Sequence, residues 1–199
     1  MYIHEGIYDY LDSLGAVSPV SIELEEDMGC YGQNYFGHIC VSSVGFERKG
    51  SIIDRIRNGE GIRTPRFTPF NFFGLLVNKL SEKAQTWNGG PNIEETGARL
   101  DEKDTTKIAG ALILAHEIGH SQRSQAIAHL MQIVGSYITI KEGFIDMIAN
   151  PVNQSQNFSA LIGGIGLCLG ASVLSEILAD NFAKRHAEGL LPYIITEEY

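Results

Sequence analysis

The chain has little positive charge and few cysteines, and each shortage excludes a class of protein. It has 15 Lys and Arg against 24 Asp and Glu, so its net charge is -9 at pH 7. A general nucleic-acid surface and attraction to anionic lipid headgroups are therefore not expected. The three cysteines, Cys30, Cys40 and Cys168, lack zinc-ribbon spacing, and their odd number favours a reduced compartment over a disulfide framework.

Targeting signals and repeats are also missing. The first residues lack a basic segment followed by an apolar one, so no signal peptide is expected and the cytoplasm is the expected location. We find no internal repeat and no low-complexity segment. The 199 residues, 44% of them hydrophobic, fit one globular domain with a substantial core.

The most informative stretch is residues 109–121, where an apolar run leads into an H-E-x-x-H pattern from His116 to His120. Residues four apart on an α-helix differ by about 40° around its axis, so both imidazoles leave one face and can bind one metal ion. Glu117 projects beside the metal, where it can hold a metal-bound water. Two His ligands and a Glu general base are the arrangement of zinc metallopeptidases.

An amphipathic helix with two surface histidines is the alternative interpretation of this pattern. The residues before His116 are apolar on nearly all sides, which indicates a buried helix. Buried histidines and a carboxylate would be costly without partners, and a metal supplies them. Asp104 or Thr105 is a suitable N-cap for a helix that extends to His120.

A second carboxylate pair follows at Glu176 and Asp180, four apart on a predicted helix. Glu176 ends a long uncharged run, and a zinc ion already held by two histidines would be a partner for it. Asp180 is placed to hydrogen-bond a zinc-ligating imidazole and fix its tautomer. The alternative is a helix carboxylate with a surface partner one turn later.

The two motifs, HEIGH and SEILADNFA, resemble those of gluzincin metallopeptidases of the HtpX, Oma and CAAX-prenyl-protease type. The resemblance implies His116, His120 and Glu176 as zinc ligands and Glu117 as the base. It also implies that the strand HICVSSVGF is an edge strand, which in that family binds substrate backbone by β-augmentation.

The chain departs from this family in two places. Residues 46–104 form a long insert unlike the family, and residues 121–124 lack the histidine often found shortly after the motif. The metzincin pattern fails, because its third histidine would fall at Ala126.

Three other residues are weaker candidates for the site. His38 is a possible third ligand, although a histidine at the start of a strand is more often hydrogen-bonded or exposed. His186 is a possible oxyanion stabiliser and Tyr193 is a second candidate. A histidine near a helix C-terminus is more often a surface cap.

The remaining elements follow from hydrophobic periodicity and turn residues. We expect helices over residues 1–14, 51–58 and 72–83, strands over 20–25 and 38–44 in a hairpin or meander, and loops over 29–37 and 86–105. The loop over residues 86–105 is a candidate lid.

Residues 158–174 are about the minimum length for a membrane span. We favour a tightly packed buried helix there, with Gly166 and Gly170 allowing close approach to the metal helix, and keep membrane association as the lesser alternative.

These observations predict one α+β domain of zincin-like fold, mainly helical, with a small sheet before the metal helix. Residues 1–45 supply a helix and strands, 46–104 an insert and loop, and 105–199 the metal-binding helices. The predicted function is hydrolysis of peptide or protein substrates with one zinc ion per chain. Two alternatives remain: an inactive zincin-fold protein with a structural or interaction role, and a zinc hydrolase that is not a peptidase. The sequence indicates no oligomeric state.

Overall fold

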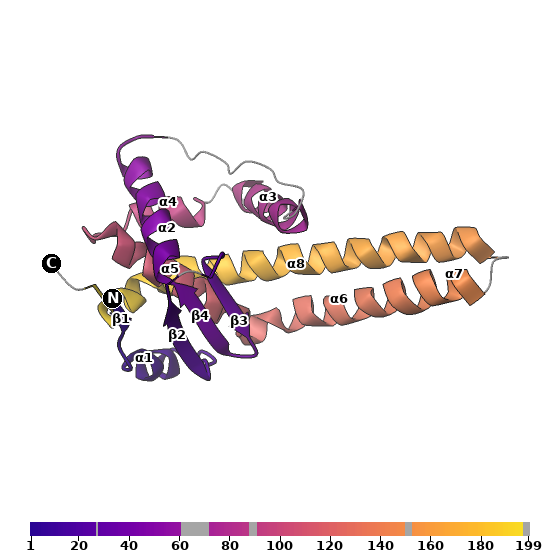
Figure 1. The fold of residues 1–199 in the computed structure, drawn as a ribbon, viewed down its shortest axis with the longest axis horizontal. Coiled ribbons are helices and arrows are strands. Elements are labelled where there is room, and N and C mark those ends of the chain that lie inside the picture. The colour runs from indigo at the N-terminus through magenta and orange to yellow at the C-terminus, as the bar shows by residue number, and fades with distance from the viewer. Residues whose placement is uncertain (27, 61–71, 88–90, 150–152, 197–199) are drawn as a thin grey trace.

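Helix α5 (Thr105–His120) runs through the centre of the body, and most of its residues are buried. Its N-cap is Asp104, whose side chain accepts hydrogen bonds from the backbone N–H groups of Thr106 and Lys107. The computed structural model in Figure 1 describes all residues except 27, 61–71, 88–90, 150–152 and 197–199. Within this part the protein is mainly helical with a small sheet, as predicted for the α+β class.

The sheet lies beside α5 and has the strand order β2-β4-β3. Its strands are β2 (Ser21–Glu25), β3 (Gly32–Tyr35) and β4 (His38–Ser42). The predicted strands are confirmed, but the loop prediction for residues 29–37 is wrong, because β3 lies inside it. β3 pairs with β4 through a two-residue turn, whereas β2 and β4 are parallel and therefore form no hairpin. The edge next to α5 is β3, and β4 is the central strand rather than an edge.

The two chain ends meet in a second, two-stranded sheet. Strand β1 (Tyr2–Ile3) pairs with β5 (Ile194–Ile195), which follows a 3₁₀ turn at Leu191–Tyr193. The helix expected over residues 1–14 is therefore shorter, and α1 spans Ile7–Ser13.

Three helices occupy the insert. α2 (Ser43–Arg57) begins earlier than predicted because Ser42 caps it, accepting a hydrogen bond from the Gly45 N–H. α3 (Phe72–Trp87) extends past its predicted end. α4 (Ile93–Ala98) lies in the predicted loop of residues 86–105, where Asn92 and Glu95 form a capping box; residues 88–90 of that loop lie outside the described residues. The hydrophobic core combines side chains from all three predicted parts of the chain.

A long helical hairpin projects from this body (Figure 1). After a 3₁₀ turn at Arg123–Gln125, its outgoing limb consists of α6 (Ala126–Tyr137), a π-helical stretch at Ile138–Ile145 and α7 (Asp146–Ala149). The 37-residue helix α8 (Gln154–Leu190) forms the return limb and continues into the body against α5.

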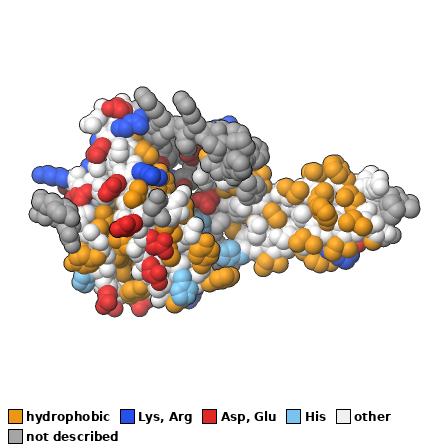
Figure 2. Space-filling view, in the orientation of Figure 1, with side chains coloured by type: hydrophobic (Ala, Val, Ile, Leu, Met, Phe, Trp, Pro, Cys, Tyr) orange, Lys and Arg blue, Asp and Glu red, His pale blue; other side chains and the backbone are white. Residues whose placement is uncertain are grey.

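The prediction of a buried helix over residues 158–174 is wrong. Only 11% of the most apolar window of α8 is buried, and α8 is the one described helix long and apolar enough to cross a membrane. Gly166 has no neighbour within 4 Å, so it makes no close approach to α5. Many hydrophobic side chains instead lie exposed along the face of the hairpin that Figure 2 shows. The large exposed ones are Ile127, Leu130, Ile133, Val134, Tyr137, Ile140, Phe144, Ile145, Ile148, Phe158, Ile162 and Ile165.

The two limbs touch at Gly164, and a substitution there should separate them. A methyl group at Gly164 would lie 2.7 Å from the Thr139 backbone N, whereas one at Gly163 would meet nothing within 4 Å. We expect Gly164→Ala to lower the free energy of unfolding by about 1–3 kcal/mol. Gly163→Ala should leave it unchanged or raise it by up to about 1 kcal/mol. Thermal unfolding followed by circular dichroism measures both, and equal effects of the two variants would contradict the observed packing.

Candidate metal centre

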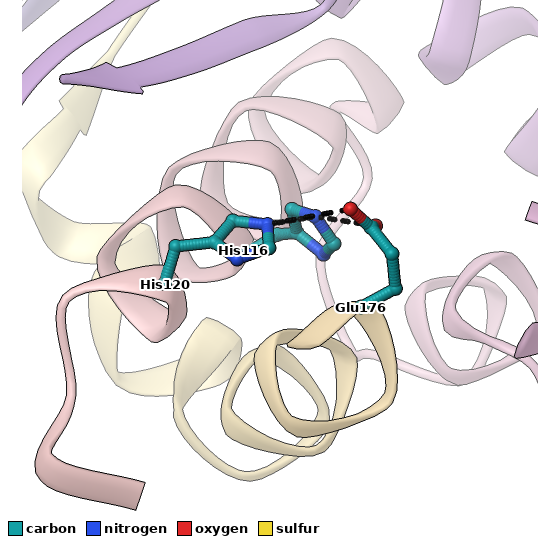
Figure 3. A group of neighbouring side chains, drawn as sticks. All are labelled: His116, His120 and Glu176. Atoms are coloured by element: carbon teal, nitrogen blue, oxygen red, sulfur yellow. Dashed lines mark hydrogen bonds and ion pairs between the residues drawn. The ribbon is translucent and has the colours of Figure 1, made fainter. Parts of the chain in front are cut away.

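The last turn of α5 and the middle of α8 bring four predicted residues together. Gly119 lets the two helices approach, since a Cβ there would lie 2.8 Å from the Ala179 Cα. His116 and His120 project from α5 toward Glu176 on α8, as Figure 3 shows, and Asp180 follows one turn later. Residues far apart in the sequence therefore form one cluster.

The donor atoms of this cluster face one another. His116 Nε2 lies 3.1 Å from His120 Nε2 and 3.3 Å from Glu176 Oε2. His120 Nε2 lies 3.7 Å from Glu176 Oε1. All three residues offer ligand atoms within 4.8 Å of one another.

These separations fit a tetrahedral zinc ion. Zinc binds His nitrogen and carboxylate oxygen at about 2.0–2.1 Å, so neighbouring ligand atoms on a tetrahedron lie about 3.4 Å apart. The distances of 3.1, 3.3 and 3.7 Å in the cluster bracket that value. Two neutral imidazoles and one carboxylate are also a ligand set that zinc accepts, and they leave a fourth position open.

The remaining imidazole nitrogens are held by α8. His116 Nδ1 lies 2.7 Å from Asp180 Oδ1, and His120 Nδ1 lies 3.1 Å from Ser175 Oγ. Both contacts leave the Nε2 atoms directed at the space between the two rings and Glu176. Metal-binding histidines are commonly oriented in this way, by a hydrogen bond at the ring nitrogen that does not bind the metal. The role predicted for Asp180 matches this contact, whereas sequence reasoning missed Ser175, although it directly precedes Glu176.

Glu117 lies beside the cluster and is 8% exposed. Strand β3 covers it: a Cβ at Gly32 would lie 2.7 Å from the Glu117 Cγ, so only glycine leaves room for this carboxylate. Asn34 Nδ2 donates to the Glu117 backbone oxygen at 2.6 Å and to Ser121 Oγ at 2.7 Å. Neither Gly32 nor Asn34 was found from the sequence, because both resemble turn residues there.

Burial and the neighbouring charges set the protonation of the cluster. Burial alone would lower the pKa of His116, but its hydrogen bonds to Asp180 and Glu176 raise that pKa to about 10. Burial and the charge on His116 lower the pKa of His120 to about 4. Burial raises the pKa of Glu117 to about 7. His116 therefore carries a proton at neutral pH, and a metal must displace it.

A cleft of about 1240 Å³ opens over the cluster. Its walls include β3 and parts of α2, α4 and α8. Lys49 lines it, with Nζ 3.1 Å from Glu94 Oε1 and 5.5 Å from the centre of the Tyr31 ring. His129, at the start of the hairpin, also lines the cleft. A cleft of this volume is large enough to hold a ligand.

The structure does not bring the weaker candidates to the cluster. His38 is exposed and lies 2.9 Å from Ser21 Oγ through its Nδ1. His186 packs against Phe182, about 15 Å along α8 from Glu176 by helical rise. Tyr193 packs against Tyr10 near the chain ends. None of the three is among the residues that line the cleft.

A second group could also offer metal ligands. Glu23 and Glu25 on β2 and Cys40 on β4 lie within 4.8 Å of one another. Both carboxylates are exposed, and burial together with those carboxylates raises the pKa of the Cys40 thiol. This group lacks the oriented imidazoles of the helical cluster.

Comparison with known proteins adds no relative. No protein-family model matches the chain, and no curated protein or solved structure is significantly similar to it.

Zinc binding should depend on pH through His116. Because its raised pKa keeps a proton on the ring, zinc competes with that proton, and affinity should rise about tenfold per pH unit from pH 7 to 9. Calorimetry in two buffers of different ionisation enthalpy should show about one proton released per zinc at pH 7.5.

Asp180→Asn removes the carboxylate that raises the pKa of His116, so this variant should release fewer protons and bind zinc roughly 10–100-fold more weakly. Zinc binding without proton release in the wild type would contradict this protonation state.

Proposed function

We propose that the protein is a zinc-dependent metallopeptidase whose ligands are His116, His120 and Glu176. The observation that carries this proposal is the agreement between the ligand separations and those of a tetrahedral zinc site. Glu117 lies beside these ligands and lines the same cleft. The cleft over the cluster and the resemblance of the two motifs to gluzincins support it.

Glu117 is the general base and acid in this proposal. When bound, zinc would polarise the scissile carbonyl and lower the pKa of the attacking water. Glu117 accepts the proton of that water and passes it to the leaving amine. Its raised pKa, near 7, suits a group that must both take and return a proton near neutral pH.

Strand β3 is the substrate-binding edge in this proposal. Among the described strands it pairs only with β4, and its residues Gly32, Asn34 and Tyr35 line the cleft. An extended peptide added along this edge would run past Glu117 and the metal position. The edge assigned from the resemblance was β4, so the proposed role moves to its neighbour.

Two variants test the peptidase against the alternative of an inactive zincin. Purified wild type should contain about one zinc per chain and cleave an unfolded protein such as alkylated casein. Glu176→Ala should lose most of its zinc, whereas Glu117→Gln should keep its zinc and lose at least about 100-fold in kcat. Circular dichroism checks that all three are folded. One zinc per wild-type chain without cleavage would support the inactive alternative, and a fully active Glu117→Gln variant would overturn the assigned base.

We also propose that the hairpin lies in a lipid bilayer, in place of the cytoplasmic location favoured by the sequence. Its exposed apolar side chains occupy both limbs and extend along most of the length of the hairpin, which is more apolar surface than a soluble protein usually exposes. From Ala126 to Ser175 the only Asp, Glu, Lys or Arg residues are Lys141, Glu142 and Asp146, and Lys141 pairs with Asp146 at 2.8 Å. Between Gln154 and Ser175, α8 rises about 33 Å, enough for a hydrocarbon core of about 30 Å.

Alkaline carbonate extraction tests this placement, since it releases peripheral proteins and leaves integral ones in the membrane pellet. Wild type should stay in the pellet. Replacing Leu130, Ile133 and Ile162 together by lysine should move the protein to the supernatant. The matched control replaces Tyr2 and Leu14, which are also exposed but lie outside the hairpin, and should stay in the pellet. Release of the wild type into the supernatant would contradict membrane insertion.

A further inference from the structure

The turn between β3 and β4 carries an aromatic side chain that the fold does not require. Phe36 and Gly37 form it with φ of 53° and 88°, a pair of positive values for which Asn-Gly is the favoured sequence. Phe36 is fully exposed, so no packing in the body compensates for the cost of a positive φ at a bulky residue. A large apolar residue at such a position points to a contact outside the chain.

Two neighbours extend this apolar surface. Tyr35 is 60% exposed and Val20 is 67% exposed. The Val20 N–H donates to the Gly37 carbonyl at 2.7 Å, which holds the two segments together. Residues 28–46 contain no Asp, Glu, Lys or Arg, and neither do residues 13–22. We call Val20, Tyr35, Phe36 and Gly37 the Phe36 turn.

The Phe36 turn lies at the root of the hairpin. Asn34, two residues before Phe36, donates to Ser121 at the end of α5. Val17 and Gln122 exchange two hydrogen bonds, from the Val17 N–H at 2.9 Å and to the Val17 carbonyl at 3.1 Å. The turn also shares the cleft wall with His129 on α6. Its apolar surface therefore lies next to the point where the hairpin leaves the body.

We propose that the Phe36 turn is a second lipid contact, which enters the interfacial region of the bilayer that holds the hairpin. This inference rests on the membrane placement proposed above. Phe and Tyr side chains beside an uncharged segment suit the boundary between headgroups and acyl chains. Because β3 contacts Glu117 through Gly32 and Asn34, a turn seated there holds the cleft against the membrane surface.

Depth-dependent fluorescence quenching in phosphatidylcholine vesicles tests this contact. The full chain carries one tryptophan, Trp87, which is replaced by Phe. Single tryptophans are then introduced by Phe36→Trp in the turn, by Phe158→Trp in the hairpin, and by Tyr2→Trp in β1, at the opposite end of the molecule (Figure 1). Lipids brominated near the headgroup end of the chains should quench position 36 at least twofold and leave position 2 unchanged. Position 158 shows whether the hairpin is inserted.

The outcomes separate this inference from the membrane placement itself. Quenching at 158 but not at 36 overturns the lipid contact of the turn and leaves the hairpin inserted. Absence of quenching at both positions overturns both. Blue-shifted but unquenched emission at 36 shows a protein contact, such as a second copy, and also overturns the inference. A second variant pair places the tryptophan at position 35 by Tyr35→Trp and compares it with and without Phe36→Asn. Asparagine tolerates the positive φ at position 36, so the turn should still fold, but removing the Phe36 ring should reduce quenching at position 35 at least twofold.

Discussion

The candidate metal centre exists only because α5 and α8 cross in close contact. His116 and Asp180 are 64 residues apart in the sequence, yet their side chains lie 2.7 Å apart where the helices cross. Asp180 orients one imidazole, Ser175 orients the other, and Glu176 lies between them on the same helix. Without this crossing, α5 would carry two histidines and a glutamate in a buried helix with no partners.

The same contact links the candidate metal centre to the hairpin. α8 is one continuous helix, so its apolar outer part and its ligand-bearing inner part form a single element. The outgoing limb leaves the body within a few residues of His120. Any surface that holds the hairpin therefore also fixes the position of the cleft. Under the proposed membrane placement, the hairpin would anchor the body through its apolar side chains, so the net negative charge of the chain would not need attraction to anionic lipid.

Features that depend on residue spacing within one helix could be predicted from the sequence. Features that depend on what surrounds a segment, such as β3 and the exposure of residues 158–174, could not. The shared face of His116 and His120 follows from helical geometry, and the cap at Asp104 follows from the preference for a polar residue at a helix start. The spacing of Glu176 and Asp180 predicted that the two carboxylates share a face, but only the crossing of α5 and α8 brings Asp180 to His116. β3 was missed because Gly32 and Asn34 favour turns, and the turn at Phe36 has an unusual residue at a positive φ. The exposure of residues 158–174 could not be read from composition, since lipid and a protein interior both accept an apolar helix.

X-ray absorption at the zinc edge of the zinc-loaded protein distinguishes the two groups that could hold a metal. Binding by His116, His120 and Glu176 should give nitrogen and oxygen ligands at about 2.0–2.1 Å, with the outer-shell scattering of two imidazoles and no sulfur. A sulfur ligand at about 2.3 Å would place the metal at Cys40 instead, and a folded protein that binds no zinc would rule out the proposed metal centre.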